Sequence, residues 1–423
     1  MNYTELTKEQ LETLLVTEQK DYDALVAEGN KVDIARGKPC AEQLVLATEM
    51  FDLLSKDTTM PKSYRNYGML EGSPEMRKLF ADILGVKPTE IIVGGSSSLN
   101  LMYDTVQRAL QFGVCGGAPW DKKKTKFLCP VPGYDRHFAM LEHFGIGMIN
   151  IPMDEKGPNI DLIEQLVAND EDIKGIWCVP KYSNPTGITY SDEVVTRLAK
   201  MATKAKDFRI FWDNAYVVHE LTDTPDKLAN IQEIAAANGN QDRVYQFTST
   251  SKITFAGSGV SCIATSENNV KDILVHLAFQ TISYNKVLQY AHYLYLKDSA
   301  NITEIMKKQA AIIAPKFQAI VNAMEENFGS DSGIAQWSNP KGGYFITLWT
   351  NKGCAKRVFE LCKKAGLTIT SAGAPYPYGR DDDDRVLRIA PTFTSDTDLR
   401  VATKILITCV KVASIEKLLS KEN

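Results

Sequence analysis

The chain has 423 residues, a formal net charge of −4 and a pI near 5.9. Its 44% hydrophobic and 24% charged residues are typical of a globular protein with more than one core, and its acidic balance gives no electrostatic reason to expect nucleic acid or an anionic membrane as partner. The sequence contains no apolar run long enough to span a membrane, and the polar N-terminus MNYTELTKEQ is unlike a secretory signal, so we expect a cytoplasmic protein. Eight cysteines without a CxxC pair and five histidines without an HExxH arrangement predict reduced thiols and no metal site.

The N-terminal part of the chain has two helical patterns joined by irregular segments. Residues 5–29 carry apolar side chains at three- and four-residue spacing, which predicts one helix or a pair of helices. The run IARGKP at 34–39 indicates irregular backbone, and a second helical pattern then leads to a polar, aromatic loop at 64–68. Ser73 and Pro74 suit the N-cap and the first position of the next helix.

From about residue 90 onward, short β-rich runs alternate with helical patterns. The runs that predict strands lie at 91–95, 126–130, 147–153, 175–180, 209–213, 244–248 and 260–265. The helical patterns lie at 98–112, 134–144, 160–169 and 191–206. Nearly continuous apolar strands separated by helices predict an α/β fold with a mostly parallel seven-stranded sheet sandwiched by helices. In such a sheet the ligand binds beyond one end, where loops from several strands converge.

The C-terminal part of the chain predicts a smaller α+β domain. Helical patterns at 268–297 and 301–328 are followed by strand signals at 343–349, 367–372 and 386–391 and by helical patterns near 353–365 and 395–419. We expect the N-terminal segment to complete this domain, with a large domain at 50–310 and a small domain made of 1–49 and 311–423. The four carboxylates at 381–384 favour a solvated loop, because adjacent side chains cannot all face one metal ion.

One lysine has a setting that distinguishes it from the other basic residues of the chain. The stretch YQFTSTSKITFAGSG at 245–259 indicates a strand, a hydroxyl-rich turn, Lys252 and a glycine-containing loop. A lysine at the end of a buried strand is partly desolvated, which lowers the pKa of its amine and enables it to form a Schiff base with a carbonyl. Ser249 and Ser251 beside it, with the glycines that follow, offer hydroxyl and backbone donors to an anion.

Two further segments that follow expected strands carry polar side chains. The run GGSSS at 94–98 offers glycine N–H groups, hydroxyls and a helix N-terminus to a phosphate, although a plain helix cap explains it equally well. Its spacing is neither GxGxxG nor GxxxxGKS. In VPGYDRH, Tyr134 could lie flat on a planar ring with His137 three residues further on, but a lone pair of this kind is more often structural.

Two more strand ends carry an amide and a carboxylate. In YSNPTG, Asn184 presents its amide beside Pro185, before which a cis peptide bond is plausible. In FWDNAY, Asp213 ends an apolar strand, and it is either a helix N-cap or the counter-ion of a protonated ring nitrogen. Asn184, Asp213 and Lys252 are separated by 29 and 39 residues, so each gap holds about one helix and one strand. All three can therefore lie at the same end of one sheet.

Taken in chain order, these residues resemble fold-type I pyridoxal-phosphate enzymes, and within them the class I/II aminotransferases. The matching residues and runs are Tyr67, 95–98, Tyr134, 184–187, Asp213 with Tyr216, Ser249, Lys252, and Arg388 in LRIAPT. The match is collinear over nearly the whole chain. The phrases ARGKP, GYDRH and STSKITFAG resemble most closely the branch that contains MocR-like proteins and divergent bacterial aspartate aminotransferases.

The resemblance implies a role for each matching residue around pyridoxal 5′-phosphate. Lys252 would carry the cofactor as a Schiff base and then move the substrate proton, while Asp213, braced by His137, would keep the pyridinium nitrogen protonated. Tyr134 would stack on the ring. The donors to the ring's phenolic oxygen would be Tyr216 and Asn184. The residues around the phosphate would be Ser96, Ser97, Ser98, Ser249 and, from the neighbouring subunit of a homodimer, Tyr67.

The resemblance also implies a substrate site and reveals one departure from the family pattern. Arg388 would clamp the substrate α-carboxylate in bidentate fashion, with Asn184 and the Gly37 backbone beside it. Relatives usually carry an arginine after the lysine, in a pattern like PGxRxG, whereas Gly259 stands at that position in AGSGVS. The phosphate therefore needs another cation, for which Lys286 in SYNKVLQ is our candidate, or more help from hydroxyls.

The nature of the amino donor depends on a second cation. Arg36, next to Gly37, is either a partner for a dicarboxylic side chain or part of an ion pair at a domain boundary. With the resemblance, Arg36 favours transamination between aspartate and 2-oxoglutarate. Alanine, aromatic and aminoadipate donors are the alternatives.

Two other classes of protein were weighed against this hypothesis. Residues 249–252 fit SxxK, 182–184 resemble SxN and 341–343 loosely resemble KTG, as in serine acyl-transferases related to penicillin-binding proteins. Here, however, the SxN-like element comes first and the SxxK element closes a strand. A pyridoxal-phosphate-dependent sensor of the MocR type or a lyase is the other alternative, but only about thirty residues precede ARGKP, too few for a winged-helix domain.

Overall fold

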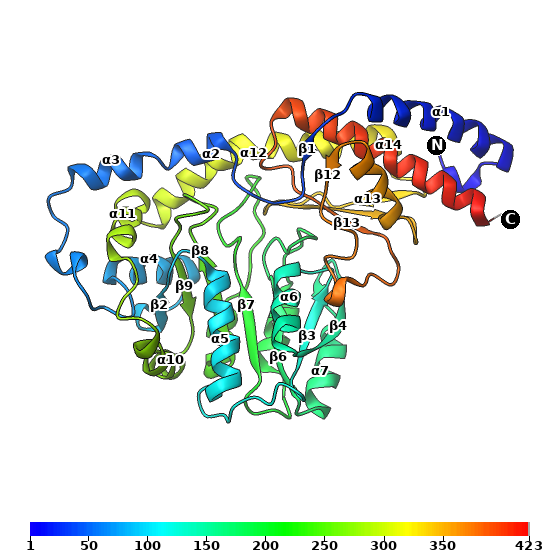
Figure 1. Ribbon diagram of the computed structural model, residues 1–423. Coiled ribbons are helices and arrows are strands. Elements are labelled where there is room, and N and C mark those ends of the chain that lie inside the picture. Colours follow the sequence, from blue (N-terminus) through cyan, green and yellow to red (C-terminus); the bar gives the residue numbers. More distant parts are fainter. Residues whose placement is uncertain (422–423) are drawn as a thin grey trace.

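The computed structural model describes residues 1–421, and its largest element is an eight-stranded sheet (Figure 1). The strands are β2 (Ile91–Val93), β3 (Lys126–Val131), β4 (Gly147–Asp154), β5 (Gly157–Pro158), β6 (Ile173–Cys178), β7 (Arg209–Asp213), β8 (Val244–Ser249) and β9 (Ser261–Ala264). Their order is β2-β9-β8-β7-β6-β3-β4-β5. The pairs among β4, β3, β6, β7 and β8 are parallel, whereas β9 runs antiparallel to β2 and β8. All seven strands predicted for this sheet are confirmed, and the short β5 is the one strand of the sheet that was not predicted.

Alternate residues of each central strand enter different cores, because successive side chains point to opposite faces of a sheet. Phe211 packs with one set of helices, and its neighbours Ile210 and Trp212 pack with the other. The helices on the Phe211 face are α5 (Ser98–Phe112), α6 (Asp135–Phe144) and α10 (Glu267–Gln280). The helices on the opposite face are α7 (Ile160–Asn169), α8 (Asp192–Lys200) and α9 (Ile231–Ala237). The near-continuous apolar runs in the sequence reflect this burial on both faces.

Two small sheets and their helices form a second core above one end of the large sheet (Figure 1). An antiparallel sheet contains β10 (Ala335–Trp337), β11 (Ile346–Thr350) and β13 (Val386–Ile389), and a parallel pair contains β1 (Val32–Asp33) and β12 (Leu367–Thr368). The helices around them are α1 (Lys8–Ala27), α13 (Ala355–Lys364) and α14 (Asp396–Lys421). The N-terminal segment belongs to this core, because Leu25 is buried in it and the Tyr22 hydroxyl donates to the Leu361 carbonyl at 3.1 Å.

The long helix α12 (Ser299–Phe328) connects the two parts of the molecule. Its first half contributes Ile302 and Met306 to a core shared with β2 and β9, and its second half contributes Phe317 and Met324 to the core of the small sheets. The remaining helices are α2 (Ala41–Leu46), α3 (Glu49–Lys56), α4 (Pro74–Leu84) and α11 (Lys286–Leu296). The 3-10 helices are Tyr3–Glu5, Lys62–Arg65, Pro88–Glu90, Gln241–Arg243 and Pro377–Gly379.

Three expectations about local structure need correction. The pattern at 268–297 is two helices, because α10 ends at Gln280 and the Asn285 side chain caps α11 anew. The pattern at 191–206 ends at Lys200, where Met201 turns to extended backbone. The acidic run is not wholly solvated, since Asp381 is buried and accepts backbone N–H bonds that shape the turn before β13. Ser73 and Pro74 begin α4 as predicted, and the bond before Pro185 is cis.

Candidate active site

A cavity of about 430 Å³ lies at the carboxyl ends of the large-sheet strands, facing the small sheets. Eleven of the sequence-predicted residues line it: Arg36, Gly37, Ser97, Ser98, Tyr134, Asn184, Asp213, Tyr216, Ser249, Lys252 and Arg388. Parallel strands explain this convergence, because the loops that leave their carboxyl ends all emerge at one edge. Side chains that are more than 350 residues apart in the sequence thus meet around one volume.

Lys252 lies in the turn that follows β8, with its amine between two aromatic rings. The amine is 5.2 Å from the Tyr216 ring centroid and 6.0 Å from that of Tyr344. Backbone bonds fix the turn, since the Thr250 N–H donates to Val260 and the Ile253 N–H donates to Thr250. Burial lowers the pKa of the Lys252 amine, and the Asp213 carboxylate only partly opposes this effect. A larger fraction of the amine is therefore neutral, and so nucleophilic, than in an exposed lysine.

Asp213 is a buried carboxylate with one oxygen satisfied and one without a partner. Its Oδ2 lies 3.0 Å from His137 Nε2, and the His137 ring stacks on Trp177 with centroids 4.2 Å apart. Its Oδ1 has no hydrogen-bond partner within residues 1–421. Because an unpaired buried acceptor is costly, this oxygen calls for a donor from a bound molecule. A protonated ring nitrogen fits that requirement, so the residues present suit pyridoxal 5′-phosphate.

Tyr134 lines the cavity and would stack on the ring of such a cofactor. Tyr134 stands edge-on to His137, with ring centroids 4.9 Å apart, and burial raises the pKa of its hydroxyl to about 12. Burial also raises the pKa of the Tyr216 hydroxyl, which keeps it protonated and able to donate. Asn184 accepts from Arg388 Nη1 at 3.3 Å through its Oδ1, so its amide N–H groups stay available to a ring oxygen.

Hydroxyls and a helix N-terminus form the anion-binding end of the cavity. Ser97 is the N-cap of α5 but makes no side-chain cap bond, and Ser98 is the first residue of the helix. Across from them, Ser249 Oγ donates to Ser251 Oγ at 3.1 Å, and Ser251 Oγ donates to the Ser96 carbonyl at 3.2 Å. Ser251, which also lines the cavity, joins the predicted set, whereas Ser96 is exposed and does not line the cavity. Helix dipole and donors together suit a phosphate.

The packing around Gly259 explains why an arginine is missing from this loop. A Cβ atom on Gly259 would lie 2.8 Å from Ser251 Oγ and 3.0 Å from Ser251 Cα, so no longer side chain fits without moving the turn. The structure does not bring the candidate replacement, Lys286, to the cavity. Its amine donates to the Gly68 carbonyl at 2.8 Å, and burial lowers its pKa. Tyr67 also lies outside the cavity, with 78% of its surface exposed.

Arg388 reaches the cavity from β13 and is held on several sides. Its guanidinium lies 4.9 Å from the Phe345 ring centroid, and its Nη1 donates to Asp135 Oδ1 at 2.6 Å. The Phe345 ring also explains Gly37, where a Cβ atom would lie 2.7 Å from it. The sequence analysis did not single out Asp135. Its only signal was the position directly after Tyr134 in GYDRH.

Two exposed arginines line the cavity without forming an ion pair with a carboxylate among the described residues. Arg36 and Arg136 both border the cavity, and neither side chain has a hydrogen bond or ion pair with another described residue. The sequence analysis named Arg36 and missed Arg136. Unpaired guanidinium groups at a cavity favour the binding of anions.

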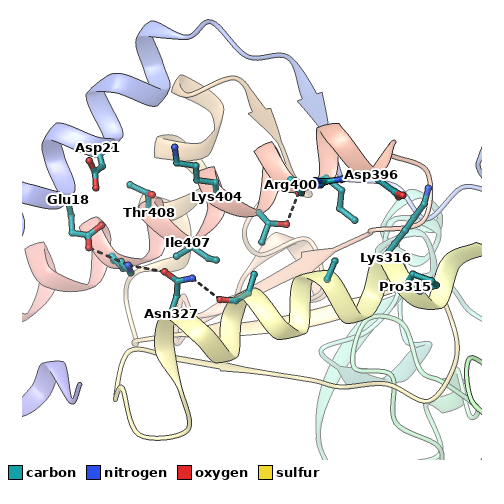
Figure 2. A pocket seen from close by; sticks show the side chains of 15 residues that line it. Glu18, Asp21, Pro315, Lys316, Asn327, Asp396, Arg400, Lys404, Ile407 and Thr408 are labelled. Atoms are coloured by element: carbon teal, nitrogen blue, oxygen red, sulfur yellow. Dashed lines mark hydrogen bonds and ion pairs between the residues drawn. The ribbon is translucent and has the colours of Figure 1, made fainter.

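A second cavity, of about 480 Å³, is lined by residues of the helices α1, α12 and α14 (Figure 2). Some of its charged side chains neutralise each other, since Lys411 lies 3.4 Å from Glu18 and donates to Asn327 at 3.2 Å. Lys316 donates to the carbonyl of Thr394 at 2.7 Å. The strand-end residues of the large sheet do not border it. Chemistry rather than size therefore assigns the active site to the cavity around Lys252.

The fold and this site together define an aminotransferase of the aspartate aminotransferase type. The chain matches the aspartate amino-transferase family over residues 6–422. It is 43% identical over 403 residues to an aspartate aminotransferase of Corynebacterium glutamicum, covering 94% of this chain and 93% of that one. The chain therefore belongs to the aspartate aminotransferase family. This membership, and the position of Ser249 at the end of a strand, count against a serine acyl-transferase.

Solved structures agree with the family assignment. The crystal structure of an aspartate transaminase from Corynebacterium glutamicum superposes with a TM-score of 0.95 at 41% identity, covering 99% of each chain. The α-aminoadipate aminotransferase LysN of Thermus thermophilus, solved in complex with N-(5′-phosphopyridoxyl)-L-leucine, superposes with a TM-score of 0.73 at 19% identity, covering 92% of this chain and 93% of that one. The second likeness concerns the fold alone. No helix in the described part of the chain is long and apolar enough to cross a membrane.

Proposed function

We propose that this aminotransferase uses pyridoxal 5′-phosphate to exchange an amino group between L-aspartate and 2-oxoglutarate. The observation that carries the proposal is a pair of groups on one cavity: the Lys252 amine with its lowered pKa and the Asp213 oxygen that lacks a donor within the described chain. When bound, the cofactor supplies an aldehyde to the amine and an electron-accepting ring to the substrate.

Each residue of the cavity would have a distinct role in binding the cofactor or in transferring the proton. Lys252 would tether the cofactor through its neutral amine, and the same amine, when free, would take the proton from the substrate Cα and deliver it to the cofactor carbon that carried the aldehyde. Asp213 would accept the ring N–H, and His137, which stacks on Trp177, keeps that carboxylate in place through its bond to Oδ2. Asn184 would donate to the ring oxygen, since Arg388 Nη1 donates to the Asn184 Oδ1 and so orients the amide.

The charges around the cavity favour a dicarboxylic substrate. Apart from the Lys252 amine, which would carry the cofactor, the basic side chains that line it are Arg36, Lys38, Arg136 and Arg388. The carboxylates that line it are Asp135 and Asp213. A cofactor phosphate uses only part of this excess of positive charge, so a substrate with a second carboxylate gains attraction that alanine or an aromatic amino acid does not. The names of the Corynebacterium relatives support aspartate as the donor.

A homodimer is part of the proposal, because the anion-binding end of the cavity is incomplete in one chain. Lys286, the candidate replacement for the arginine that Gly259 excludes, donates to the Gly68 carbonyl and does not line the cavity. Tyr67 is 78% exposed and Phe279 is 90% exposed, as expected of aromatic side chains that meet a second copy. A neighbouring Tyr67 hydroxyl would then supply a further donor to the phosphate.

The cofactor assignment is tested by visible absorption spectroscopy of the purified protein before and after addition of L-aspartate. We expect a cofactor band that changes on addition of aspartate, and borohydride reduction that attaches the cofactor to the peptide containing Lys252. Lys252→Ala should lose both the attachment and turnover. A wild-type protein that binds no cofactor, or an alanine variant with parental turnover, would exclude the proposal.

The substrate assignment is tested by single-turnover rates for a panel of amino acids with the wild type and with Arg36→Gln and Arg136→Gln. Loss of one charge-assisted bond of about 1.5–3 kcal/mol should slow aspartate roughly tenfold to a hundredfold and leave alanine nearly unchanged. If aspartate and glutamate react no better than alanine or phenylalanine with the wild type, the dicarboxylate assignment is wrong.

A further inference from the structure

The carboxylate of Asp135 already forms an ion pair with Arg388, the arginine proposed to bind the substrate carboxylate. Asp135 Oδ1 lies 2.6 Å from Arg388 Nη1, and the two side chains are 32% and 7% exposed. Both residues line the cavity. Asp135 is the first residue of α6, which covers the large sheet, whereas Arg388 lies on β13 in the antiparallel small sheet. The ion pair thus joins the two parts of the molecule across the substrate site.

Few donors of Arg388 are left for a ligand while this ion pair is intact. An arginine has five N–H donors, three of them on Nε and Nη1. Nη1 donates to Asp135 and to Asn184, at 2.6 Å and 3.3 Å, and Nε donates to Thr370 Oγ1 at 3.3 Å. Only Nη2 is free of these bonds. A bidentate contact through both Nη atoms therefore requires that Asp135 release Nη1.

We propose that Asp135 is an internal competitor for Arg388, which holds the arginine when no ligand carboxylate is present and yields it when one binds. The inference rests on the proposed function, in which Arg388 receives the α-carboxylate. Released Asp135 keeps a favourable environment, because it lies at the positive N-terminal end of α6 next to the unpaired Arg136. Two carboxylates on one guanidinium would repel each other, which favours exchange over sharing.

This competition has a use in a reaction that proceeds in two halves. The first 2-oxo acid must leave before the second one binds, and both carry the same carboxylate next to the reacting carbon. Asp135 recaptures Arg388 as the product leaves, so it weakens every such ligand by a similar factor and shortens the time for which the product stays. It does not discriminate between aspartate and alanine, because both present the same α-carboxylate to Arg388. The ion pair thus lowers the affinity for carboxylate ligands and speeds the release of the 2-oxo acid product.

The test is calorimetric titration of the cofactor-loaded protein with maleate, an unreactive dicarboxylate, in the wild type and in Asp135→Asn. Asparagine keeps the shape but loses the charge, so we expect the Kd of maleate to fall about tenfold. Half-saturation in single turnover should fall by a similar factor for L-aspartate and L-alanine, and steady-state kcat should not rise. Glu142→Gln removes a charge from an exposed position of the same helix and should change none of these quantities.

If Asp135 helps Arg388 to bind the ligand instead of competing with it, the Kd of maleate should change in the opposite direction in Asp135→Asn. If the carboxylate only orients Arg388 for a contact through Nε and Nη2, Asp135→Asn loosens the arginine and the Kd of maleate rises, which overturns the proposal, as does an unchanged Kd. Asp135→Ser is the second variant, and if both variants lose the wild-type circular dichroism spectrum, the ion pair is structural and the proposal is also wrong. Maleate does not react, so its titration of the cofactor-loaded protein remains readable even if the amino acid panel refutes the proposed substrate.

Discussion

Replacing Asp213 by asparagine should have opposite effects on the stability of the cofactor-free protein and on its affinity for the cofactor. The side chain is 4% exposed, and its Oδ1 lacks a partner among the described residues. An unsatisfied buried acceptor costs about 1–3 kcal/mol, and more when it is charged. Asparagine can still accept from His137 while it removes the buried charge. The free energy of unfolding without cofactor should therefore stay equal or increase by about 1–3 kcal/mol.

The same substitution should weaken cofactor binding. An amide N–H in place of Oδ1 faces the ring N–H donor, so a charge-assisted bond of about 1.5–3 kcal/mol is lost and the Kd of the cofactor should rise roughly tenfold to a hundredfold. Thermal unfolding without cofactor and spectroscopic titration with it measure the two effects. Asp381→Asn is the matched control, because Asp381 is also buried but both of its oxygens accept backbone N–H bonds. We expect that variant to be destabilised and to bind the cofactor normally; equal destabilisation of both variants would refute the reasoning.

Two further predictions concern packing and pH. Gly259→Ala should destabilise the protein by about 1–3 kcal/mol because its Cβ would lie within 3.0 Å of Ser251, whereas Gly257→Ala, with open space around it, should be neutral in the same unfolding assay. Burial and the charge of Lys252 lower the pKa of His219 to about 3. Since only the unfolded chain then binds this proton between about pH 6.5 and about pH 3, stability should fall with falling pH in that window. His219→Gln should reduce that slope by at most about 1.4 kcal/mol per pH unit in urea unfolding, and an unchanged slope would contradict the prediction.

The sequence predicted the large sheet because the physical cause of its pattern is local. A strand buried on both faces needs apolar residues at nearly every position, as in β7, where all five residues are buried. Polar residues directly after such strands must then meet at one edge, so the positions of Asn184, Asp213 and Lys252 followed from chain order alone. The break between α10 and α11 was missed because both sides of residue 285 have helical spacing, and only the cap at Asn285 marks the boundary.

Contacts between distant segments were the part that the sequence did not contain. The bond between Asp135 and Arg388 joins residues 253 positions apart, and no pattern near either residue indicates the other. The missing arginine could be noticed in the sequence, but its cause required the distance from Gly259 to Ser251. The sequence also could not show that the Lys286 amine bonds to the Gly68 carbonyl, because this contact depends on where α11 begins relative to Gly68.

Helix α6 contacts both ends of the proposed reaction site, and its geometry keeps the two contacts independent. Asp135 and His137 are two positions apart, so their side chains leave the helix in different directions. His137 points into the core of the large sheet, where its stack on Trp177 and its bond to Asp213 fix the helix. Asp135 instead meets Arg388 from the small sheet. A movement between the two parts of the molecule would therefore stretch the pair of Asp135 with Arg388 and leave the pair of His137 with Asp213 unchanged.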